Sequence, residues 1–209
     1  MKKIYYILTA FLVITSSVLA QNDPNAKKVL DGVSAKLKTF KGITANFSYI
    51  SKSRAGKTNS NANGKINIKG NKYYIRQGKT EIFSNGVKTW NYNGDEEVTI
   101  TPVEADGKAL TPQRLLTNFY DRDFTYKLIS SAGGYHQIDM TPTDKRKNFQ
   151  KVTVYVDKAK MMVTRATILD KSSNTISFNL KNVVTNAAIP DATFVFNKNK
   201  YKKSIEVIE

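Results

Sequence analysis

Apolar residues recur at helical spacing in the stretch between Asp23 and Phe40. The apolar positions inside this stretch are Ala26, Val29, Leu30, Val33 and Leu37. Because they lie three or four residues apart, they share one face of a predicted α-helix. Asp23 suits the N-cap position and Pro24 suits the first helical position. We therefore expect an amphipathic helix that ends near Gly42. Its opposite face carries Lys27, Lys28, Lys36 and Lys38.

After this helix the apolar residues follow an alternating pattern. Apolar and polar residues alternate over residues 43–49, 65–69 and 152–156. Strict alternation predicts β-strands that bury one face. The Asn-Gly pairs at residues 85–86 and 93–94 lie between such runs and supply the positive φ angles of tight hairpin turns. The sequence therefore predicts an antiparallel sheet of about ten or eleven strands.

Two segments interrupt the strand pattern. Residues 51–63 are polar and lack periodicity, so we expect a mobile loop between the first two strands. Residues 111–119 begin with Thr111 and Pro112, which suit an N-cap and a first helical position. We expect a short helix here. Its apolar face consists of Leu115, Leu116 and Phe119.

The first twenty residues have the composition of a secretory signal peptide. Two lysines precede an apolar stretch over residues 4–13, and residues 18–20 are small or aliphatic, as a signal peptidase requires. The apolar stretch is too short to span a bilayer. We expect cleavage after Ala20, which leaves residues 21–209 as a single domain outside the cytosol.

Composition excludes several kinds of chemistry. The 209 residues include no Cys and a single His, His136. Zinc–thiolate sites, iron–sulfur clusters and a Cys nucleophile are therefore excluded. His136 lies in a predicted strand beside two glycines, where a polar surface position suits it better than a catalytic role. We expect no metal, no cofactor and no catalytic residue.

The chain is strongly basic. It has 33 Lys and Arg against 17 Asp and Glu, which gives a formal net charge of +16. We interpret the basic residues as a solvated surface that keeps the protein soluble. Nucleic acid is not an expected partner, because the sequence has no recognition motif for it and carries a secretory signal.

The predicted elements leave an apolar surface to be covered. A sheet of this width has a long apolar face, and one long and one short helix cover only part of it. The strands either close into a barrel around a cavity or curl into an open half-barrel with the helices as a partial lid. Both arrangements leave an apolar pocket, although aromatic residues on strands are also ordinary core residues.

Several short motifs then follow one another in order. Residues 64–70 read GKINIKG, residues 72–76 read KYYIR, and residues 83–93 read FSNGVKTWNYN. Further along come LTPQRLL at residues 110–116 and IPDATFVF at residues 189–196, the latter as a closing strand. In this order, with the opening helix and the signal peptide, they resemble the LolA family, the periplasmic carriers of outer-membrane lipoproteins. The resemblance spans nearly all of the chain after the signal peptide.

The resemblance implies a mainly β fold with helices (α+β), an open antiparallel half-barrel of about 11 strands with the helices covering its mouth. It implies a chaperone that binds the acyl chains of lipoproteins in a hydrophobic cavity and catalyses no reaction. An inner-membrane ABC-type exporter would load the lipoprotein, and an outer-membrane acceptor would receive it. We expect a periplasmic monomer that ferries lipoproteins from the inner to the outer membrane.

Two other functions are considered beside this one. The first is general binding of lipids or other hydrophobic ligands, or envelope-stress sensing, by a module of the same fold. The second is an enzyme such as a glycan- or lipid-acting hydrolase, which requires two close carboxylates that the sequence does not place together. The identity of the ligand retained by the secreted protein separates the carrier from the other binding modules.

The expected cavity residues come from the helices and from the strands nearest the motifs. We expect the cavity to be lined by Leu30, Val33, Phe47, Tyr49, Ile66, Ile68, Tyr73, Ile75, Phe83, Trp90, Tyr92, Leu115, Leu116 and Phe119. Family members commonly carry a basic residue followed by proline at the end of the second strand, and an arginine there holds the lid helices. This chain has Lys69 followed by Gly70. Lys69 is therefore the candidate lid contact, as a point charge without the planar fork of a guanidinium group.

Overall fold

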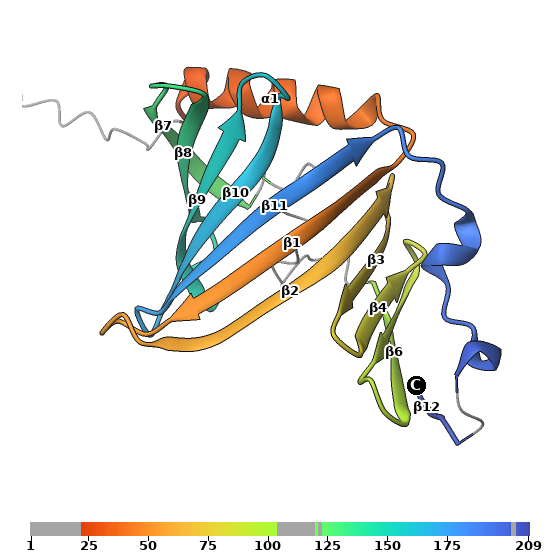
Figure 1. The fold of residues 1–209 in the computed structure, drawn as a ribbon. Coiled ribbons are helices and arrows are strands. Elements are labelled where there is room, and N and C mark those ends of the chain that lie inside the picture. The colour runs from red at the N-terminus through yellow and green to blue at the C-terminus, as the bar shows by residue number, and fades with distance from the viewer. Residues whose placement is uncertain (1–21, 104–119, 121–122, 202–203) are drawn as a thin grey trace, which may run out of the picture.

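A single curled sheet of twelve strands dominates the computed structural model, which describes residues 22–103, 120, 123–201 and 204–209 (Figure 1). The strand order is β12-β6-β5-β4-β3-β2-β1-β11-β10-β9-β8-β7, and the two end strands do not pair with each other. All neighbouring strands are antiparallel except β12 and β6, which are parallel. The predicted open antiparallel half-barrel is confirmed.

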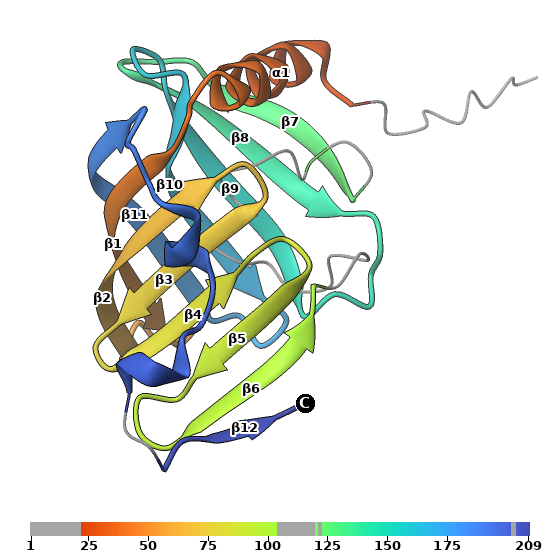
Figure 2. The same ribbon diagram turned by 90° about the vertical axis from the view of Figure 1, so that its right-hand side faces the viewer.

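The sheet has two halves joined at its centre by β1 and β11. The first half consists of β1 (Ile43–Lys52), β2 (Thr58–Lys69), β3 (Lys72–Gln77), β4 (Thr80–Ser84), β5 (Lys88–Tyr92) and β6 (Glu97–Pro102). The second half consists of β7 (Phe124–Ser130), β8 (Tyr135–Pro142), β9 (Phe149–Asp157), β10 (Met162–Asp170) and β11 (Thr175–Thr185). Figure 2 shows the curl that brings the two halves to face each other.

The helix α1 (Pro24–Lys38) packs mainly on β7 and β10, along one rim of the sheet (Figure 1). Its predicted N-cap is confirmed, since the Asp23 side chain accepts hydrogen bonds from the backbone N–H groups of Asn25 and Ala26. We call the face of the sheet on which α1 packs the inner face and the opposite face the outer face. No helix in the described residues is long and apolar enough to cross a membrane.

Residues 189–201 and 204–209, here called the C-terminal segment, first pack on the outer face of β3 and β4 and then join the edge of the sheet beside β6 (Figure 1). The segment consists of two short 3₁₀ helices and a strand: η1 (Asp191–Phe194), η2 (Lys198–Lys200) and β12 (Glu206–Ile208). The closing strand expected at residues 189–196 is therefore wrong, because residues 191–194 form a 3₁₀ turn. Phe194 is fully buried at this turn, which packs on β3 and β4.

The loop expected at residues 51–63 is also wrong. The hairpin of β1 and β2 extends through these residues and closes in a turn in which Ser53 N–H donates to the carbonyl of Lys57. The far part of β2 is exposed on both faces, so neither face needs apolar residues there. In such a strand polar and apolar residues do not alternate, so the sequence pattern does not reveal it. The short helix predicted at residues 111–119 lies outside the described residues.

Asn22 and Asp23 hold α1 on the edge strand β7. The backbone N–H of Tyr126 donates to Asn22 Oδ1 over 3.0 Å, and that of Leu128 donates to Asp23 Oδ2 over 2.9 Å. In return, the Asp23 N–H donates to the Tyr126 carbonyl over 3.2 Å. These bonds occupy backbone groups that an edge strand otherwise leaves open to other chains. Asp23 is thus both the cap of α1 and its anchor on the sheet.

Replacing Asp23 with alanine is expected to lower the melting temperature by about 3 °C or more, because the cap of α1 and the partner of Leu128 are lost together. The backbone hydrogen bond from Leu128 also lowers the pKa of the Asp23 carboxyl below 3.8. Its stabilising effect is therefore present above pH 3.8 and lost as the pH falls below it. Thermal melting from neutral to acidic pH checks both statements. The control is Asp23→Asn, which keeps an acceptor and should melt close to the unchanged protein at neutral pH.

Candidate functional site

The candidate site is the inner face of the sheet, where apolar side chains form continuous rows across the strands. One row runs through Ala45, Ile66, Ile75 and Ile82 on β1 to β4. A second row runs from β1 into the other half of the sheet through Tyr49, Phe178, Ala166, Val154, Ile138 and Leu128. All of these residues belong to one hydrophobic cluster or pack against it. The apolar inner face therefore extends over both halves of the sheet.

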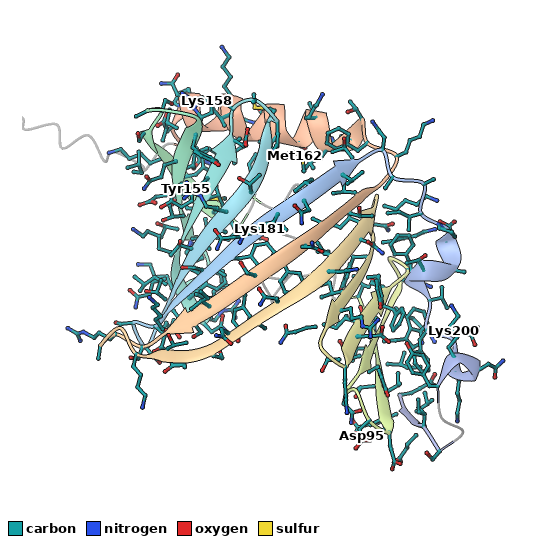
Figure 3. The ribbon with its side chains drawn as sticks, in the orientation of Figure 1. Asp95, Tyr155, Lys158, Met162, Lys181 and Lys200 are labelled. Atoms are coloured by element: carbon teal, nitrogen blue, oxygen red, sulfur yellow. The ribbon has the colours of Figure 1, made fainter. Side chains whose placement is uncertain are left out.

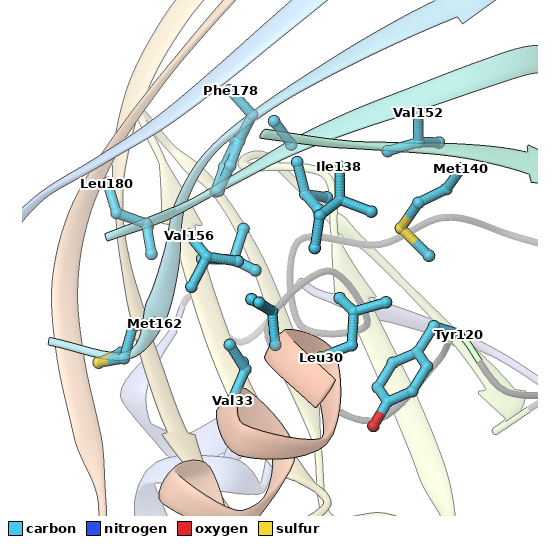
Figure 4. Close-up of a cluster of buried hydrophobic side chains, with 14 of the residues drawn as sticks. Leu30, Val33, Tyr120, Ile138, Met140, Val152, Val156, Met162, Phe178 and Leu180 are labelled. Carbon is cyan, nitrogen blue, oxygen red and sulfur yellow. The ribbon is translucent and has the colours of Figure 1, made fainter. Parts of the chain in front are cut away.

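Most of the predicted lining residues lie together on this face. Those that belong to the cluster or pack against it are Leu30, Val33, Phe47, Tyr49, Ile66, Ile68, Tyr73 and Ile75. Figure 4 shows Leu30 and Val33 of α1 pointing toward Ile138, Val156 and Phe178 of the sheet. Leu115, Leu116 and Phe119 lie outside the described residues. The structure thus brings α1 and the first three strands together in one apolar cluster.

Phe47 occupies the centre of the inner face because its neighbour on β2 is a glycine. The strand register sets Phe47 opposite Gly64, and the Phe47 ring stacks on Phe178 with 5.7 Å between the ring centres. A Cβ on Gly64 would lie 2.5 Å from Cζ of Phe47 and 2.2 Å from the Arg76 carbonyl oxygen. The missing side chain therefore gives the ring its place between the two halves of the sheet.

Tyr120 ties α1 to the rest of the cluster. Its hydroxyl donates to Oδ1 of Asp31 over 2.8 Å, and its ring meets Tyr126 edge to face with 6.0 Å between centres. Hydrogen bonds from Lys27 and then from Tyr120 lower the pKa of the Asp31 carboxyl. Asp31 is therefore ionised at neutral pH and holds α1 from its middle turn, in addition to the anchor at Asp23.

Three predicted lining residues, Phe83, Trp90 and Tyr92, lie on the outer face instead. The register pairs Phe83 with Trp90, and the inner row passes through the preceding residue, Ile82. Phe83 meets Phe196 of the C-terminal segment edge to face with 5.8 Å between ring centres. Tyr92 lies beside Tyr201 of the same segment at 4.7 Å. Their assignment to the cavity is therefore wrong.

The outer aromatic residues form a second, smaller core under the C-terminal segment. Glu81 links the sheet to the C-terminal segment. Its carboxylate accepts one hydrogen bond from the hydroxyl of Tyr74 on β3 and another from the hydroxyl of Tyr201. Burial, followed by the hydrogen bond to Glu81, raises the pKa of both tyrosines. The neutral hydroxyls are therefore favoured in the folded protein.

Alkaline pH is expected to destabilise this second core. In the unfolded chain tyrosine ionises near pH 10.0, whereas the folded protein holds the Tyr201 proton more tightly. The stability that Tyr201 contributes is therefore complete below pH 10.0 and lost as the pH rises above it. Tyr201→Phe should lower the melting temperature at neutral pH and reduce its further fall above pH 10.0. Tyr155→Phe on β9 serves as control and should keep the full alkaline fall, and equal alkaline profiles for the two variants would contradict this account.

Lys69 binds the C-terminal segment. The sequence predicted that it contacts the lid helices, and the structure shows a different partner. Its ammonium group donates to Oδ1 of Asp191 over 2.8 Å and to the carbonyl of Ile189 over 3.2 Å. Lys72 pairs with the other oxygen of Asp191 over 3.1 Å. These side chains are substantially exposed, so the ion pairs add little to stability.

Sequence reasoning missed the contribution of the later strands to the site. The missed inner-face residues include Ile82, Ile138, Met140, Val154, Phe178 and Leu180. Alternation at residues 152–156 predicted a strand but not which half of the sheet it would join. Among the described residues, no three His, Asp or Glu side chains gather into a group that could hold a metal ion. The described part of the site is thus lined by apolar side chains, most of which are buried in this structure.

Comparison with known proteins gives a family and several similar folds. A family described as "Outer membrane lipoprotein carrier protein LolA" matches residues 38–197. No curated protein is similar enough in sequence to match. An uncharacterized conserved protein from Thermus thermophilus is 13% identical, with a TM-score of 0.55 over 88% of this chain and 98% of that one. At this identity the likeness shows a shared fold alone.

Two further solved structures have lower TM-scores. A LolA superfamily protein from Nitrosomonas europaea is 14% identical, with a TM-score of 0.48 over 82% of this chain and 97% of that one. The lipoprotein LppX from Mycobacterium tuberculosis is 12% identical, with a TM-score of 0.45 over 81% of this chain and 99% of that one.

Proposed function

Because the chain belongs to the family of the outer membrane lipoprotein carrier protein LolA, we propose that it binds the acyl chains of lipoproteins on its inner face and carries them across the periplasm. In this proposal it acts as a carrier and not as an enzyme. Residues 1–20 direct it out of the cytosol and are removed after Ala20. An inner-membrane ABC-type exporter loads it, and an acceptor at the outer membrane relieves it of its cargo.

The observation that carries the proposal is the extent of the apolar inner face relative to its helix. The row through Ala45, Ile66, Ile75 and Ile82 continues to β4, whereas α1 packs mainly on β7 and β10 at the other side of the sheet. The first three residues of the row are buried, so acyl chains bind there by displacing the groups that cover them. Acyl chains are flexible and apolar, so they match a long apolar surface without needing specific polar partners. The inner face therefore suits them better than a compact polar substrate.

A carrier must also release its cargo, which limits how tightly it can bind. Each methylene that is buried contributes about 0.8 kcal/mol, so full burial of several acyl chains would prevent transfer. In the structure Leu30 and Val33 of α1 are 2% and 6% exposed against the inner face. If cargo displaces them, part of the gain from burying acyl chains is offset. The anchors at Asp23 and Asp31 then set how easily α1 gives way.

The proposal is tested by identifying the ligand that the protein retains when it is purified from its native envelope. Mass spectrometry should find triacylated lipoprotein bound to it. Free fatty acid or phospholipid in place of lipoprotein would contradict the carrier proposal and support a general lipid-binding module. Protein recovered without any lipid, under conditions in which lipoproteins are being exported, would contradict both.

A further inference from the structure

The solvent side of α1 is covered with lysines. Lys27, Lys28, Lys36 and Lys38 lie on the helix, Lys41 follows it, and all five are exposed. At 1.5 Å per residue, the helical lysines extend over about 16 Å of the axis. Asp31 is the one acid within the helix sequence, and it is already bound to Lys27 over 3.0 Å and to Tyr120. The result is a basic face with little opposing charge.

Most of these lysines have no anionic partner in the protein. The ammonium groups of Lys28, Lys38 and Lys41 make no ion pair or hydrogen bond with another residue in the described part of the chain. Lys36 lies 5.5 Å from the ring centre of Phe40, which is a cation–π contact and leaves its charge unbalanced. An anionic surface would supply the partners that these lysines lack.

The position of α1 gives this face a defined direction. The apolar side of the helix is buried against the inner face of the sheet, through Ala26, Val29, Leu30 and Val33. By helical spacing Lys28 lies opposite this buried side, whereas Lys27 and Lys38 flank it on one side and Lys36 on the other, along the rim where α1 lies (Figure 1). A flat surface that contacts the lysines would meet the protein at the rim next to the inner face, not at the outer face.

We propose that the lysine face of α1 docks the protein onto an anionic phospholipid surface, and the role of this docking in cargo delivery rests on the proposed carrier function. The composition of the face favours lipid over a protein partner. Every cation is lysine, whereas the anchors of protein interfaces are enriched in arginine and aromatic residues and depleted in lysine. Clustered lysines are a known source of electrostatic attraction to an anionic bilayer surface.

The size of the effect follows from the number of lysines. Each lysine close to an anionic leaflet contributes about 1 kcal/mol, which is roughly a fivefold change in affinity. Changing both Lys28 and Lys38 to glutamine should therefore weaken binding by about 25-fold. Because the attraction is electrostatic, it should also weaken as salt shortens the Debye length.

Co-sedimentation of the cargo-free protein with vesicles tests this proposal. The unchanged protein should bind vesicles of phosphatidylcholine and phosphatidylglycerol and should not bind vesicles of phosphatidylcholine alone. The variant that carries both Lys28→Gln and Lys38→Gln should bind the anionic vesicles about 25-fold more weakly. The matched control is Lys65→Gln with Lys181→Gln, which removes the same charge from exposed positions on the outer faces of β2 and β11. Lys181 is labelled in Figure 3. This control should change binding by less than about twofold. Both variants should melt at the temperature of the unchanged protein, because exposed lysines contribute little to stability.

Two results would overturn the proposal. The first is no binding to the anionic vesicles; if the Lys28 and Lys38 variant also transfers less cargo, the face is assigned to an acidic protein partner. The second is equal loss of vesicle binding in the two variants, which would show that net charge acts without α1. The vesicle assay contains no cargo, so a negative result there rejects the docking proposal alone. The carrier proposal is decided separately, by the ligand that mass spectrometry identifies.

Discussion

Replacing Ile82 with glutamate is expected to lower the affinity for a triacylated lipopeptide by about a hundredfold or more. Ile82 is the β4 member of the inner row that begins at Ala45, and it packs against the main cluster while remaining partly exposed. A carboxylate there would have to lose its water against an acyl chain, which costs several kcal/mol. Binding of a fluorescent triacylated lipopeptide measures the loss.

The matched control makes the same substitution on the opposite face. Ile50 on β1 points to the outer face and is 37% exposed, so Ile50→Glu adds the same charge away from the proposed site. This variant should bind the lipopeptide as the unchanged protein does, and circular dichroism should show that both variants are folded. Equal binding by the two variants, or equal loss, would contradict the assignment of acyl chains to the inner face.

Replacing Phe194 with alanine is expected to have the largest effect on stability. Phe194 is fully buried in η1, which packs on β3 and β4 from the outer side. Loss of a buried phenylalanine ring costs about 3–5 kcal/mol, which corresponds to a fall in melting temperature of roughly 10 °C. Chemical denaturation measures the free energy of unfolding directly.

The neighbouring residue provides the control for this prediction. Val195 is 40% exposed, so Val195→Ala should change the free energy of unfolding by less than about 0.5 kcal/mol. If Phe194→Ala were as mild as Val195→Ala, the C-terminal segment would not be an integral part of the fold. Lipopeptide binding by the Phe194 variant, measured below its melting temperature, should persist because the inner face is untouched.

The sequence was sufficient for features that depend on local pattern. Asp23, Pro24 and the spacing of Val29, Leu30 and Val33 predicted α1 and its cap, and the structure places each of them so. Alternation at residues 43–49, 65–69 and 152–156 predicted β1, part of β2 and part of β9. Such patterns work because one side of each element meets the core and the other meets water.

The sequence was insufficient wherever both faces of a strand are covered. β4 carries Ile82 on the inner face and Phe83 on the outer face, because the C-terminal segment covers the outer side. Two adjacent apolar residues do not reveal which of them faces the helix. Phe83, Trp90 and Tyr92 were assigned to the wrong face for this reason. Only the register of β3 to β5 and the position of Phe196 resolve it.

Long-range polar contacts were equally beyond the sequence pattern. Lys69 was expected at the lid, but it reaches Ile189 and Asp191, more than a hundred residues further along the chain. Tyr120 and Asp31 also meet although they are 89 residues apart in the sequence. Pairings of this kind depend on the completed sheet, so local spacing does not encode them.

Site-specific photo-crosslinking tests the central claim most directly. A photoreactive phenylalanine analogue placed at Tyr73, on the inner face of β3, should crosslink to lipoprotein in the native envelope. The same analogue at Trp90, on the outer face of β5, should not. Crosslinking at Trp90 with none at Tyr73 would contradict the account, because the acyl chains would then lie on the face that the structure assigns to the C-terminal segment.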